Sequence, residues 1–539
     1  MSEALPLVVA DLTFRYRDRS TPAIKGIAFS ANAGEVLLIA GASGCGKTTL
    51  VRAINGLVPR SYKGELSGKI LVFGEDTLRW KLATVSQRVG TVLQDPERQI
   101  LGTKVLSEVA FGLENLGLDR AEIRGRAEEA LALLRISDLR DRDTFSLSGG
   151  EKQKVALAGV LAMRPSILLL DEPLASLDAA SAQDSLQMVR KLADEGMTVL
   201  MVEHRVEDVM RIGPERVMFM SDGEIRYLGP LSELSNAVDY REVKLPAGDI
   251  VARARTEPAP RPLRILPGIS AARSDAEPLV RFEGVSFGYD AEGDVLHGID
   301  LDIRVGDVIA VLGANGAGKT TLVKHAIGLL KPRSGRVFVE GRDTKEASVA
   351  QIASTLGYVF QSPSHMLFAP TVREELAFGP INLKHPKTEI EKEVKEALVT
   401  VNLTANEHDP PLAMSFGQQK RVSIAAILAM RSRILVMDEP TAGQDYQNYM
   451  NFMDSILQMP GFSAVMFITH DVDLAVIYAN RVLLVAGGRL IADGRPEQVL
   501  RDFGQLEACR LVPSSLLTLN VKRLPETGAF MRAEALAHI

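Results

Sequence analysis

Short, uninterrupted apolar runs recur along the chain, and each ends in glycine or in polar residues. The runs at 35–40 (EVLLIA) and 307–312 (DVIAVL) each lead into a glycine-rich loop and then into a helical stretch. Two further runs, in 167–173 (ILLLDEP) and 434–440 (ILVMDEP), end in an Asp-Glu pair. Apolar runs of this length without alternation are typical of strands buried on both faces. We therefore predict an α/β fold whose strand ends carry the polar groups.

The whole pattern occurs twice. GASGCGKTTL at Gly41 recurs as GANGAGKTTL at Gly313, and the Asp-Glu pair at Asp171 recurs at Asp438 after nearly the same interval. A repeat of this length indicates two tandem domains rather than a solenoid of short units. The predicted boundaries are 1–240 for the first domain, 241–278 for a linker, 279–505 for the second domain and 506–539 for a C-terminal tail.

The predicted linker differs in composition from both domains. Its prolines are Pro246, Pro258, Pro260, Pro262 and Pro267. Proline at this density predicts an extended, semi-stiff connection. The tail carries apolar residues that could either pack on a domain or mediate contact with a partner, and the sequence leaves both open.

The two glycine-rich loops match G-x-x-x-x-G-K-[ST], and each stands between a predicted strand and a predicted helix, which is the context of a phosphate-binding loop. Glycines let backbone N–H groups converge on phosphate oxygens, and the helix N-terminus adds a positive end. The nucleotide-binding residues predicted in these loops are Gly41, Ala42, Ser43, Gly44, Cys45, Gly46, Lys47, Thr48 and Thr49, and Gly313, Ala314, Asn315, Gly316, Ala317, Gly318, Lys319, Thr320 and Thr321. Cys45 is interpreted as a small filler of the loop rather than a redox switch.

The two acidic pairs add the residue types that magnesium-dependent phosphoryl transfer requires beside a phosphate loop. Asp171 and Asp438 are predicted to hold Mg²⁺, and Glu172 and Glu439 to orient and polarise the attacking water. A strand-end salt bridge is the structural alternative, but both pairs stand at a matched distance from a phosphate loop. The predicted metal-associated residues are Thr48, Gln94, Asp171, Thr320, Gln361 and Asp438.

Other polar and aromatic residues recur at equivalent places. Gln94 and Gln361 follow short apolar runs midway along each copy and could link Mg²⁺ and water to a mobile segment. His204 and His470 end the runs VLMVEH and VMFITH and are predicted to contact the γ-phosphate, although a lone histidine would usually be structural. Tyr16 and Tyr289 precede the two loops at nearly the same distance, so they could stack on an adenine ring or belong to the core.

Composition narrows the function classes. The 539 residues carry a net charge of −6, so an overall basic field for nucleic acid is absent. Two cysteines, Cys45 and Cys509, are too few for a disulfide scaffold and indicate a reducing compartment. We expect neither a signal peptide nor a membrane helix, because no uncharged apolar stretch reaches the ~18 residues that a span requires.

Together these residues resemble the nucleotide-binding domains of ATP-binding cassette (ABC) transporters. The matching elements are the aromatic residue, the phosphate loop, the glutamine, the signature LSGGE at 147–151, the strand LLLDEP, the D-loop SLD and the histidine. The resemblance covers most of the chain, leaving out mainly the linker and the tail. It implies two P-loop domains, each with a RecA-like α/β core, an antiparallel β subdomain and a helical subdomain, and ATP and Mg²⁺ as ligands.

A narrower resemblance follows each glutamine. QDPERQILGTKVLSEVAFG and QSPSHMLFAPTVREELAFG are similar to ATPases of energy-coupling factor (ECF) importers, although Arg98 and SPSHM depart from the commoner pattern. This resemblance implies a transmembrane T-component and a substrate-binding S-component as partners. The expected cargo is a vitamin, a vitamin precursor or a transition-metal ion, and the expected location is the cytoplasmic face of the cell membrane. The cargo itself is not encoded in this chain.

ABC domains pair head to tail, so the resemblance implies that each ATP lies between one domain's phosphate loop and the other domain's signature. The site of Lys47 would be closed by Ser415 and Gly417, and the site of Lys319 by Ser148, Gly149 and Gly150. Phe416 replaces Gly149 in the second signature, MSFGQ. If its φ is positive the ring carries a cost, whereas a helical φ leaves the backbone donor intact. We predict that both sites bind ATP and that the Lys47 site is slower by ~10-fold or less.

Two alternative functions fit parts of this layout. A tandem sugar-import ATPase resembles it, but there one half often has eroded catalytic residues, and here both halves keep Lys, Asp, Glu and His. A soluble tandem ABC factor acting on ribosomes would typically insert a long charged helical linker, whereas this linker is rich in proline. A DNA-repair ABC ATPase would need zinc-binding cysteines, which are absent.

Overall fold

A computed structural model describes residues 4–175, 177–258, 277–289, 293–441 and 444–539. The chain divides into two compact units, mainly residues 1–245 and 246–539. Each unit contains one mixed α/β sheet of six strands and one antiparallel sheet of four strands. The predicted α/β fold and the apolar runs predicted as buried strands are therefore confirmed.

The first unit builds its large sheet around the strand that precedes the phosphate loop. Its strands are β1 (Leu7–Tyr16), β2 (Ile24–Ala31), β3 (Val36–Gly41), β4 (Gly64–Val72), β5 (Glu75–Asp76), β6 (Val89–Val92), β7 (Ile167–Asp171), β8 (Thr198–Val202), β9 (Arg216–Ser221) and β10 (Glu224–Gly229). The large sheet has the order β10-β9-β3-β8-β7-β6, and the small sheet the order β2-β1-β4-β5. Strands β6, β7, β8, β3 and β9 run parallel, so β3, β7 and β8 end at the same edge, where the site residues follow them.

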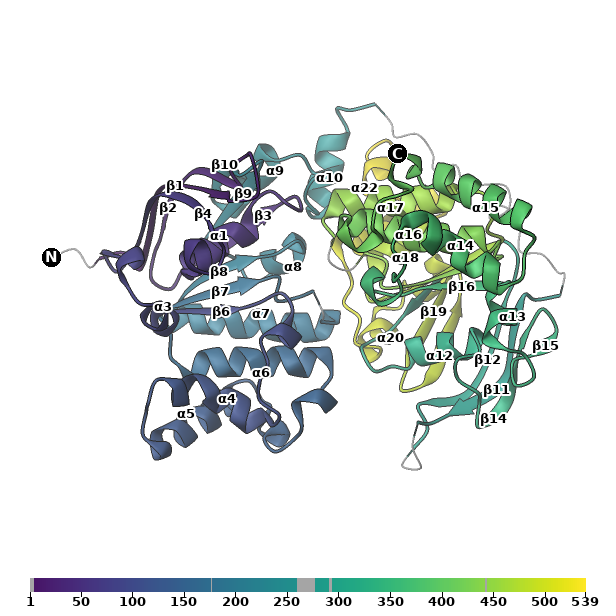
Figure 1. Ribbon diagram of the computed structural model, residues 1–539, viewed down its shortest axis with the longest axis horizontal. Coiled ribbons are helices and arrows are strands. Elements are labelled where there is room, and N and C mark those ends of the chain that lie inside the picture. The colour runs from purple at the N-terminus through teal and green to yellow at the C-terminus, as the bar shows by residue number, and fades with distance from the viewer. Residues whose placement is uncertain (1–3, 176, 259–276, 290–292, 442–443) are drawn as a thin grey trace. The chain divides into compact units, whose positions relative to one another are not determined.

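Both faces of this large sheet are covered. The helices of the first unit are α1 (Lys47–Ile54), α2 (Leu57–Arg60), α3 (Leu82–Arg88), α4 (Val105–Asn115), α5 (Arg120–Leu133), α6 (Gly149–Ala162), α7 (Ala179–Asp194), α8 (Val206–Met210) and α9 (Leu231–Ala237). Figure 1 shows the sheet between α1 and the small sheet on one side and α7 with the helical subdomain α4–α6 on the other. Fully buried Leu37, Ile39 and Leu169 pack with residues of the small sheet in one core, which explains why the strand runs lack polar alternation.

The second unit repeats this plan. Its strands are β11 (Val280–Phe287), β12 (Leu296–Ile303), β13 (Val308–Leu312), β14 (Ser334–Val339), β15 (Arg342–Asp343), β16 (Leu356–Val359), β17 (Ile434–Asp438), β18 (Ala464–Thr469), β19 (Arg481–Ala486) and β20 (Arg489–Gly494). The sheet orders are β16-β17-β18-β13-β19-β20 and β12-β11-β14-β15. The helices of the second copy are α12 (Lys319–Ala326), α13 (Val349–Ala353), α14 (Val372–Asn382), α15 (Lys387–Thr400), α16 (Phe416–Ala429), α17 (Tyr446–Gln458), α18 (Val472–Tyr478) and α19 (Pro496–Val499).

The extended linker predicted for 241–278 is wrong in its first part. Residues Ala247–Ala254 form helix α10, which packs on the C-terminal helices α21 (Ser515–Thr527) and α22 (Ala533–Leu536). Figure 1 shows α10 beside α22. The backbone N–H of Ala247 donates to Ser515 Oγ at 2.8 Å. The physical reason is that Pro246 precedes the helix and the next proline follows it, so apolar residues at helical spacing can turn one face inward. Residues 259–276, which hold the remaining prolines of the linker, lie outside the described residues.

The C-terminal tail packs on the second unit, which is one of the two possibilities left open by the sequence. It forms α20 (Phe503–Ala508), α21 and α22. Leu506, Leu517 and Leu536 are fully buried. Arg532 donates to both Asp454 in α17 and the hydroxyl of Tyr478 in α18. The tail therefore braces the two helices that follow strands β17 and β18.

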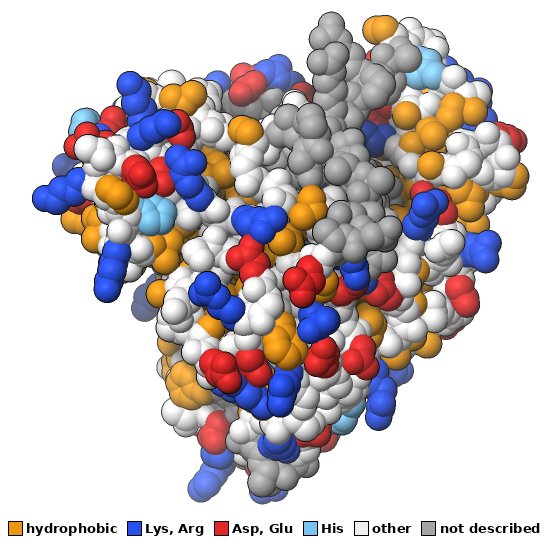
Figure 2. Space-filling model, turned by 90° about the vertical axis from the view of Figure 1, so that its right-hand side faces the viewer, with side chains coloured by type: hydrophobic (Ala, Val, Ile, Leu, Met, Phe, Trp, Pro, Cys, Tyr) orange, Lys and Arg blue, Asp and Glu red, His pale blue; other side chains and the backbone are white. Residues whose placement is uncertain are grey.

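Charges of both signs cover the face of the molecule drawn in Figure 2. Lys and Arg side chains alternate there with Asp and Glu, and apolar side chains stand between them. That face has no continuous basic field among its described residues. Across the described residues, none of the helices is both long enough and apolar enough for a bilayer span.

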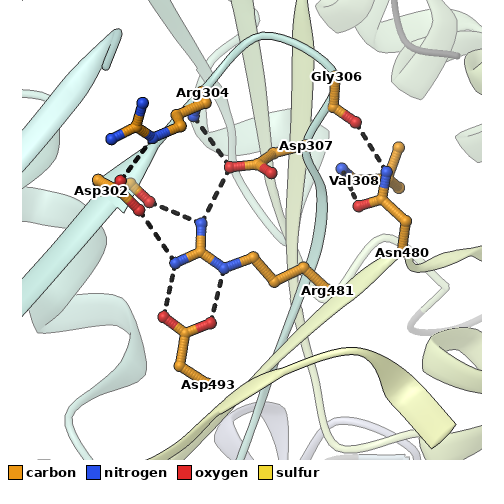
Figure 3. A network of polar contacts seen from close by, with 8 residues as sticks. All are labelled: Asp302, Arg304, Gly306, Asp307, Val308, Asn480, Arg481 and Asp493. Atoms are coloured by element: carbon orange, nitrogen blue, oxygen red, sulfur yellow. Dashed lines mark hydrogen bonds and ion pairs between the residues drawn. The ribbon is translucent and has the colours of Figure 1, made fainter. Parts of the chain in front are cut away.

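Arg481 ties the two sheets of the second unit together (Figure 3). Its guanidinium makes a bidentate pair with Asp493 in β20, at 2.6 and 2.5 Å, and donates to Asp307 at 3.0 Å and to Asp302 Oδ1 in β12 at 3.2 Å. The side chain is only 7% exposed. Because Arg481 begins β19 and the phosphate loop follows the end of the parallel strand β13, the network lies at the sheet edge opposite the site.

Candidate active sites

Glycine is required where the phosphate loops leave the sheets. Gly41, the last residue of β3, has φ 146°, and a Cβ there would lie 2.2 Å from the carbonyl oxygen of Met220. Gly46 has φ 108° and immediately precedes α1. Gly313 and Gly318 repeat both features, with φ 155° and 101°. The loops therefore bring backbone N–H groups and a helix N-terminus together, as the motif predicts.

The loop lysines are buried and folded over their own loops. Lys47 Nζ donates to the carbonyl oxygens of Gly41 and Ala42 at 2.8 and 2.9 Å. Lys319 Nζ makes the equivalent bonds at 2.8 and 2.9 Å. An ammonium group in this position lies at the mouth of the loop, where it can bind β- and γ-phosphate oxygens.

Asp171 ends β7 and supplies an unused acceptor. It is 3% exposed, and its Oδ1 is buried without a hydrogen-bond partner. A buried acceptor left unpaired is costly, so this oxygen fits a cation ligand. Burial, and then the neighbouring Glu172 charge, raise the pKa of Asp171 to about 6. A divalent cation would offset both unfavourable effects.

Glu172 is held by Gln94 and His204, two of the predicted site residues. Gln94 Nε2 donates to one carboxylate oxygen at 2.6 Å, and His204 Nε2 lies 3.1 Å from the other. The backbone N–H of Glu172 donates to Val202 at 2.9 Å, and its φ is 51°. Burial opposes ionisation, but the hydrogen bond and charge of His204 outweigh it and lower the pKa of Glu172. The carboxylate is therefore oriented and ionised at neutral pH.

In the second unit the equivalent acid, Glu439, is also held by side-chain hydrogen bonds. His470 Nδ1 lies 3.0 Å from Glu439 Oε1, and Thr469 donates to the other oxygen at 3.3 Å. Although burial again raises it, the net effect of His470 and Lys319 is to lower the pKa of Glu439. A cleft of about 350 Å³ opens here, lined among others by Tyr289, Lys319, Thr320, Gln361, Asp438 and Glu439. The structure thus brings the tyrosine, most of the phosphate loop, the glutamine and both acids of this copy to one cavity, and His470 contacts the glutamate.

The two tyrosines lie against the helices that start at the phosphate loops. Tyr16 Oη is 3.1 Å from Thr49 Oγ1, and Tyr289 Oη is 3.2 Å from Thr321 Oγ1. Each ring packs edge-on against a phenylalanine two residues earlier. Tyr289 is 55% exposed, so it is not a core residue, and its ring is available to a planar ligand.

Both signatures begin helices with the same cap. Ser148 and Ser415 are N-caps of α6 and α16, and each forms a capping box with the residue three positions later. Phe416 is the first residue of α16 and is not among the residues with positive φ. The condition that the sequence left open is therefore decided: Phe416 costs no backbone strain, and its N–H keeps the direction of a helix start. Residues 176 and 442–443, which belong to the two D-loops, lie outside the described residues.

Comparisons with known proteins agree with this geometry. The family model "ABC transporter" matches residues 24–175 and 296–442. The chain belongs to the ABC transporter family. Relatives named "Putative ABC transporter ATP-binding protein" occur in Methanosarcina mazei, at 35% identity over 93% of this chain and 91% of the relative, and in Enterococcus faecalis, at 36% identity over 94% of both.

Among solved structures, the chain is similar to CbiO1 of Clostridium perfringens, described as part of the ABC transporter complex CbiONQ. The likeness has 30% sequence identity and a TM-score of 0.40, and it covers 49% of this chain and 100% of that one. The family and the full-length relatives make this chain an ABC transporter ATP-binding subunit with two ATP-binding domains, and hence an ATPase.

Two further residues in the second ABC domain escaped the sequence reading. Tyr358 in β16 donates to Asp438 Oδ2 at 2.8 Å, beside Thr320, which donates to the same oxygen at 3.1 Å. The first domain has Thr91 at the equivalent place. Lys420, in α16, is 1% exposed and donates to the carbonyl of Pro440. A position-by-position comparison of the two copies would have flagged both residues, since each differs in chemical type.

Proposed function

We propose that this ATP-binding subunit powers an ECF-type importer for a vitamin, a vitamin precursor or a transition-metal ion. The observation that carries the ATPase half is that both domains keep the loop lysine, the paired acids and the histidine. In each domain the histidine contacts the glutamate, and the lysine bonds to the carbonyls of its own phosphate loop. The ECF half is supported by the segments after Gln94 and Gln361, which are similar to those of ECF ATPases. The test is ATP hydrolysis by the purified chain together with identification of its membrane partners.

Mg²⁺ fits the residues at the end of β7 and β17. Asp171 offers a buried unpaired oxygen, and Asp438 stands beside the hydroxyl of Thr320. We propose that Thr48, Gln94 and Asp171, and Thr320, Gln361 and Asp438, hold the ion in the two domains. Bound there, Mg²⁺ would supply positive charge that offsets the negative charge of the phosphate groups.

Glu172 and Glu439 act, in this proposal, on the attacking water. Each carboxylate is ionised, because its pKa is lowered, and each is fixed by a histidine. An oriented carboxylate accepts the water proton as the water oxygen bonds to the γ-phosphorus and the bond from that phosphorus to the oxygen of the leaving ADP breaks. The loop lysine and backbone N–H groups stabilise the charge that develops. His204 and His470 stand beside these acids, where they could also contact the γ-phosphate.

We propose that the two domains pair head to tail, so that each signature closes the nucleotide site of the other domain. A covalent connection between them makes this pairing unimolecular and raises the effective concentration of each domain for its partner. Ser415 and Gly417 would then close the Lys47 site, and Ser148, Gly149 and Gly150 the Lys319 site. Phe416 therefore belongs to the lid of the first domain's nucleotide.

The proposed partners are a T-component and an S-component, with the ATPase bound peripherally at the cytoplasmic face of the membrane. The decisive experiment is affinity purification of the tagged chain from detergent-solubilised membranes. Recovery of a multi-helix protein and a small hydrophobic protein supports the ECF assignment. Recovery of two homologous permease subunits would instead favour a sugar-import ATPase, and co-sedimentation with ribosomes would contradict a transport role.

A further inference from the structure

Three differences between the two ABC domains meet at one place. When the two Asp-Glu pairs are aligned, Gly149, Gln153 and Ser185 of the first domain correspond to Phe416, Lys420 and Phe452 of the second. In the first domain a small apolar cavity of about 20 Å³ lies here, lined among others by Gln153 and Ser185.

In the second domain the aromatic residues flank a buried cation. The Lys420 ammonium lies 5.0 Å from the centre of the Phe416 ring and 5.6 Å from that of Phe452. These distances are within the range of cation–π attraction, which is stronger when the cation is shielded from water. Lys420 is 1% exposed, and burial lowers its pKa to about 7, although the Glu439 charge opposes the shift. Phe416 and Phe452 therefore supply part of the stabilisation that the ammonium loses by leaving water.

Lys420 also contacts the turn that carries the catalytic acid. Its ammonium donates to the carbonyl of Pro440, the residue directly after Glu439. Glu439 has φ 44°, and its own N–H donates to Ile468 at 2.9 Å. The turn is therefore fixed on both sides of the acid, by β18 before it and by the signature helix α16 after it. In the first domain Gln153 Nε2 donates to the carbonyl of Pro173, so a neutral amide does the equivalent work there.

We propose that Lys420 is a positioning residue for Glu439, and that Phe416 and Phe452 form an aromatic clamp that keeps its ammonium on the Pro440 carbonyl. This proposal rests on the proposed role of Glu439 in activating water. On this proposal, Phe416 helps to position Glu439 of the second domain, and its presence in the signature is not a loss of function. The clamp also connects the first turn of the signature helix α16 to Glu439 of the same domain. A displacement of the helix would therefore shift the acid, and a displacement of the acid would shift the helix.

The test uses the full chain with Glu172→Gln, so that turnover reports the Glu439 acid. Lys420→Met keeps the length and removes the donor, whereas Lys420→Gln reinstates the amide that the first domain uses. We expect Lys420→Met to lower kcat about tenfold with the KM for ATP changed less than about twofold, which is the pattern of a lost transition-state contribution. We expect Lys420→Gln to recover most of that loss. The comparison variant is Gln153→Met in the same background. Because the Glu172 site is already silent there, any fall in kcat measures what a disturbed α6 signature does to the Lys319 site, and we expect it to be smaller than the fall in Lys420→Met.

Two outcomes would overturn the proposal. One is an unchanged kcat in Lys420→Met, and the other is an equal loss in Lys420→Met and Lys420→Gln. If Lys420→Met fails to fold, a cycle of Phe416→Gly, Lys420→Gln and their combination decides the matter: coupled effects support the clamp, and additive effects refute it. Failure of the proposed function looks different, because Glu439→Gln would then leave turnover intact in the Glu172→Gln background.

Discussion

The two ABC domains hold the same catalytic groups by different means. In the first domain Glu172 is bound by Gln94 and His204, and Asp171 keeps one oxygen without a partner. In the second domain Asp438 is bound by Tyr358 and Thr320. In the second domain, then, two side-chain donors fix the aspartate that is proposed to hold Mg²⁺, although the signature of this domain departs further from LSGGE.

This difference teaches that departures from a motif have to be judged together with their neighbours. Phe416 alone replaces the glycine of a signature that is proposed to close a nucleotide site. Its ring nevertheless lies beside the ammonium of Lys420, as does that of Phe452, and its backbone is helical. A substitution that coincides with changes at contacting positions indicates an altered design more than a loss of function.

Removal of the catalytic acids should have the largest effect and tests whether both domains turn over. We expect the Glu172→Gln and Glu439→Gln double variant to lose about 10²–10⁴-fold in kcat, since the carboxylate that accepts the water proton is gone. We expect each single variant to retain measurable activity, with the greater loss in Glu439→Gln, because the Lys47 site that remains is the one that Phe416 would close in the proposed head-to-tail pairing. Steady-state ATPase rates check this. Complete loss in Glu439→Gln with almost none in Glu172→Gln would show that Phe416 impairs the Lys47 site far more than about tenfold.

Substitution of Arg216, the first residue of β9, and of Arg481, the first residue of β19, tests how much each arginine contributes to the free energy of unfolding. Arg481→Met leaves Asp302, Asp307 and Asp493 without their shared cation, and we expect a loss of about 3–5 kcal/mol. The corresponding Arg216 pairs with the single carboxylate of Glu35 at 2.6 Å and is 28% exposed, so Arg216→Met should cost about 1–3 kcal/mol. Calorimetric unfolding of the full chain checks the order. Equal shifts in Tm for the two variants would contradict the role given to the aspartate network.

Much of this architecture was predictable from the sequence because it depends on local signals. The phosphate loops require glycine at positive φ, and continuous apolar runs require burial on both faces, so Gly41, Gly46 and the strands around them could be placed without coordinates. Glu172 and His204 could be grouped because both follow neighbouring parallel strands. Their contact at 3.1 Å follows from that topology.

What the sequence did not reveal depends on contacts between distant residues. Tyr358 reaches Asp438 from an adjacent strand, and Lys420 reaches Pro440 from a helix, so neither pairing has a fixed spacing. Helix α10 was missed because proline content describes a whole segment, whereas Pro246 stands just before the helix and none lies inside it. Whether Phe416 is strained depended on one backbone angle, which no motif specifies.

Tyr358 offers a smaller test, aimed at the metal aspartates. Tyr358→Phe removes a donor that orients Asp438, and loss of such an outer partner typically weakens metal binding about 10-fold or more. In the Glu172→Gln background we therefore expect the Mg²⁺ concentration for half-maximal turnover to rise by about that factor. Thr91→Val in the Glu439→Gln background is the matched control, because Thr91 Oγ1 is buried without a partner and donates nothing to Asp171. A similar shift in both variants would assign the effect to packing.

Cys45 provides the smallest test. It is one of two differences between the phosphate loops, where Ala317 is its counterpart and Asn315 replaces Ser43. Its side chain is 6% exposed, and burial raises the pKa of its thiol despite the opposing charge of Lys47. A raised pKa means less thiolate at pH 8 than in a free cysteine, so alkylation by iodoacetamide should be slower than that of a model thiol. Cys45→Ala, which copies the second loop, should change kcat by less than about twofold. Fast alkylation accompanied by loss of turnover would instead mark Cys45 as a redox-sensitive part of the first domain and make the two loops functionally unequal.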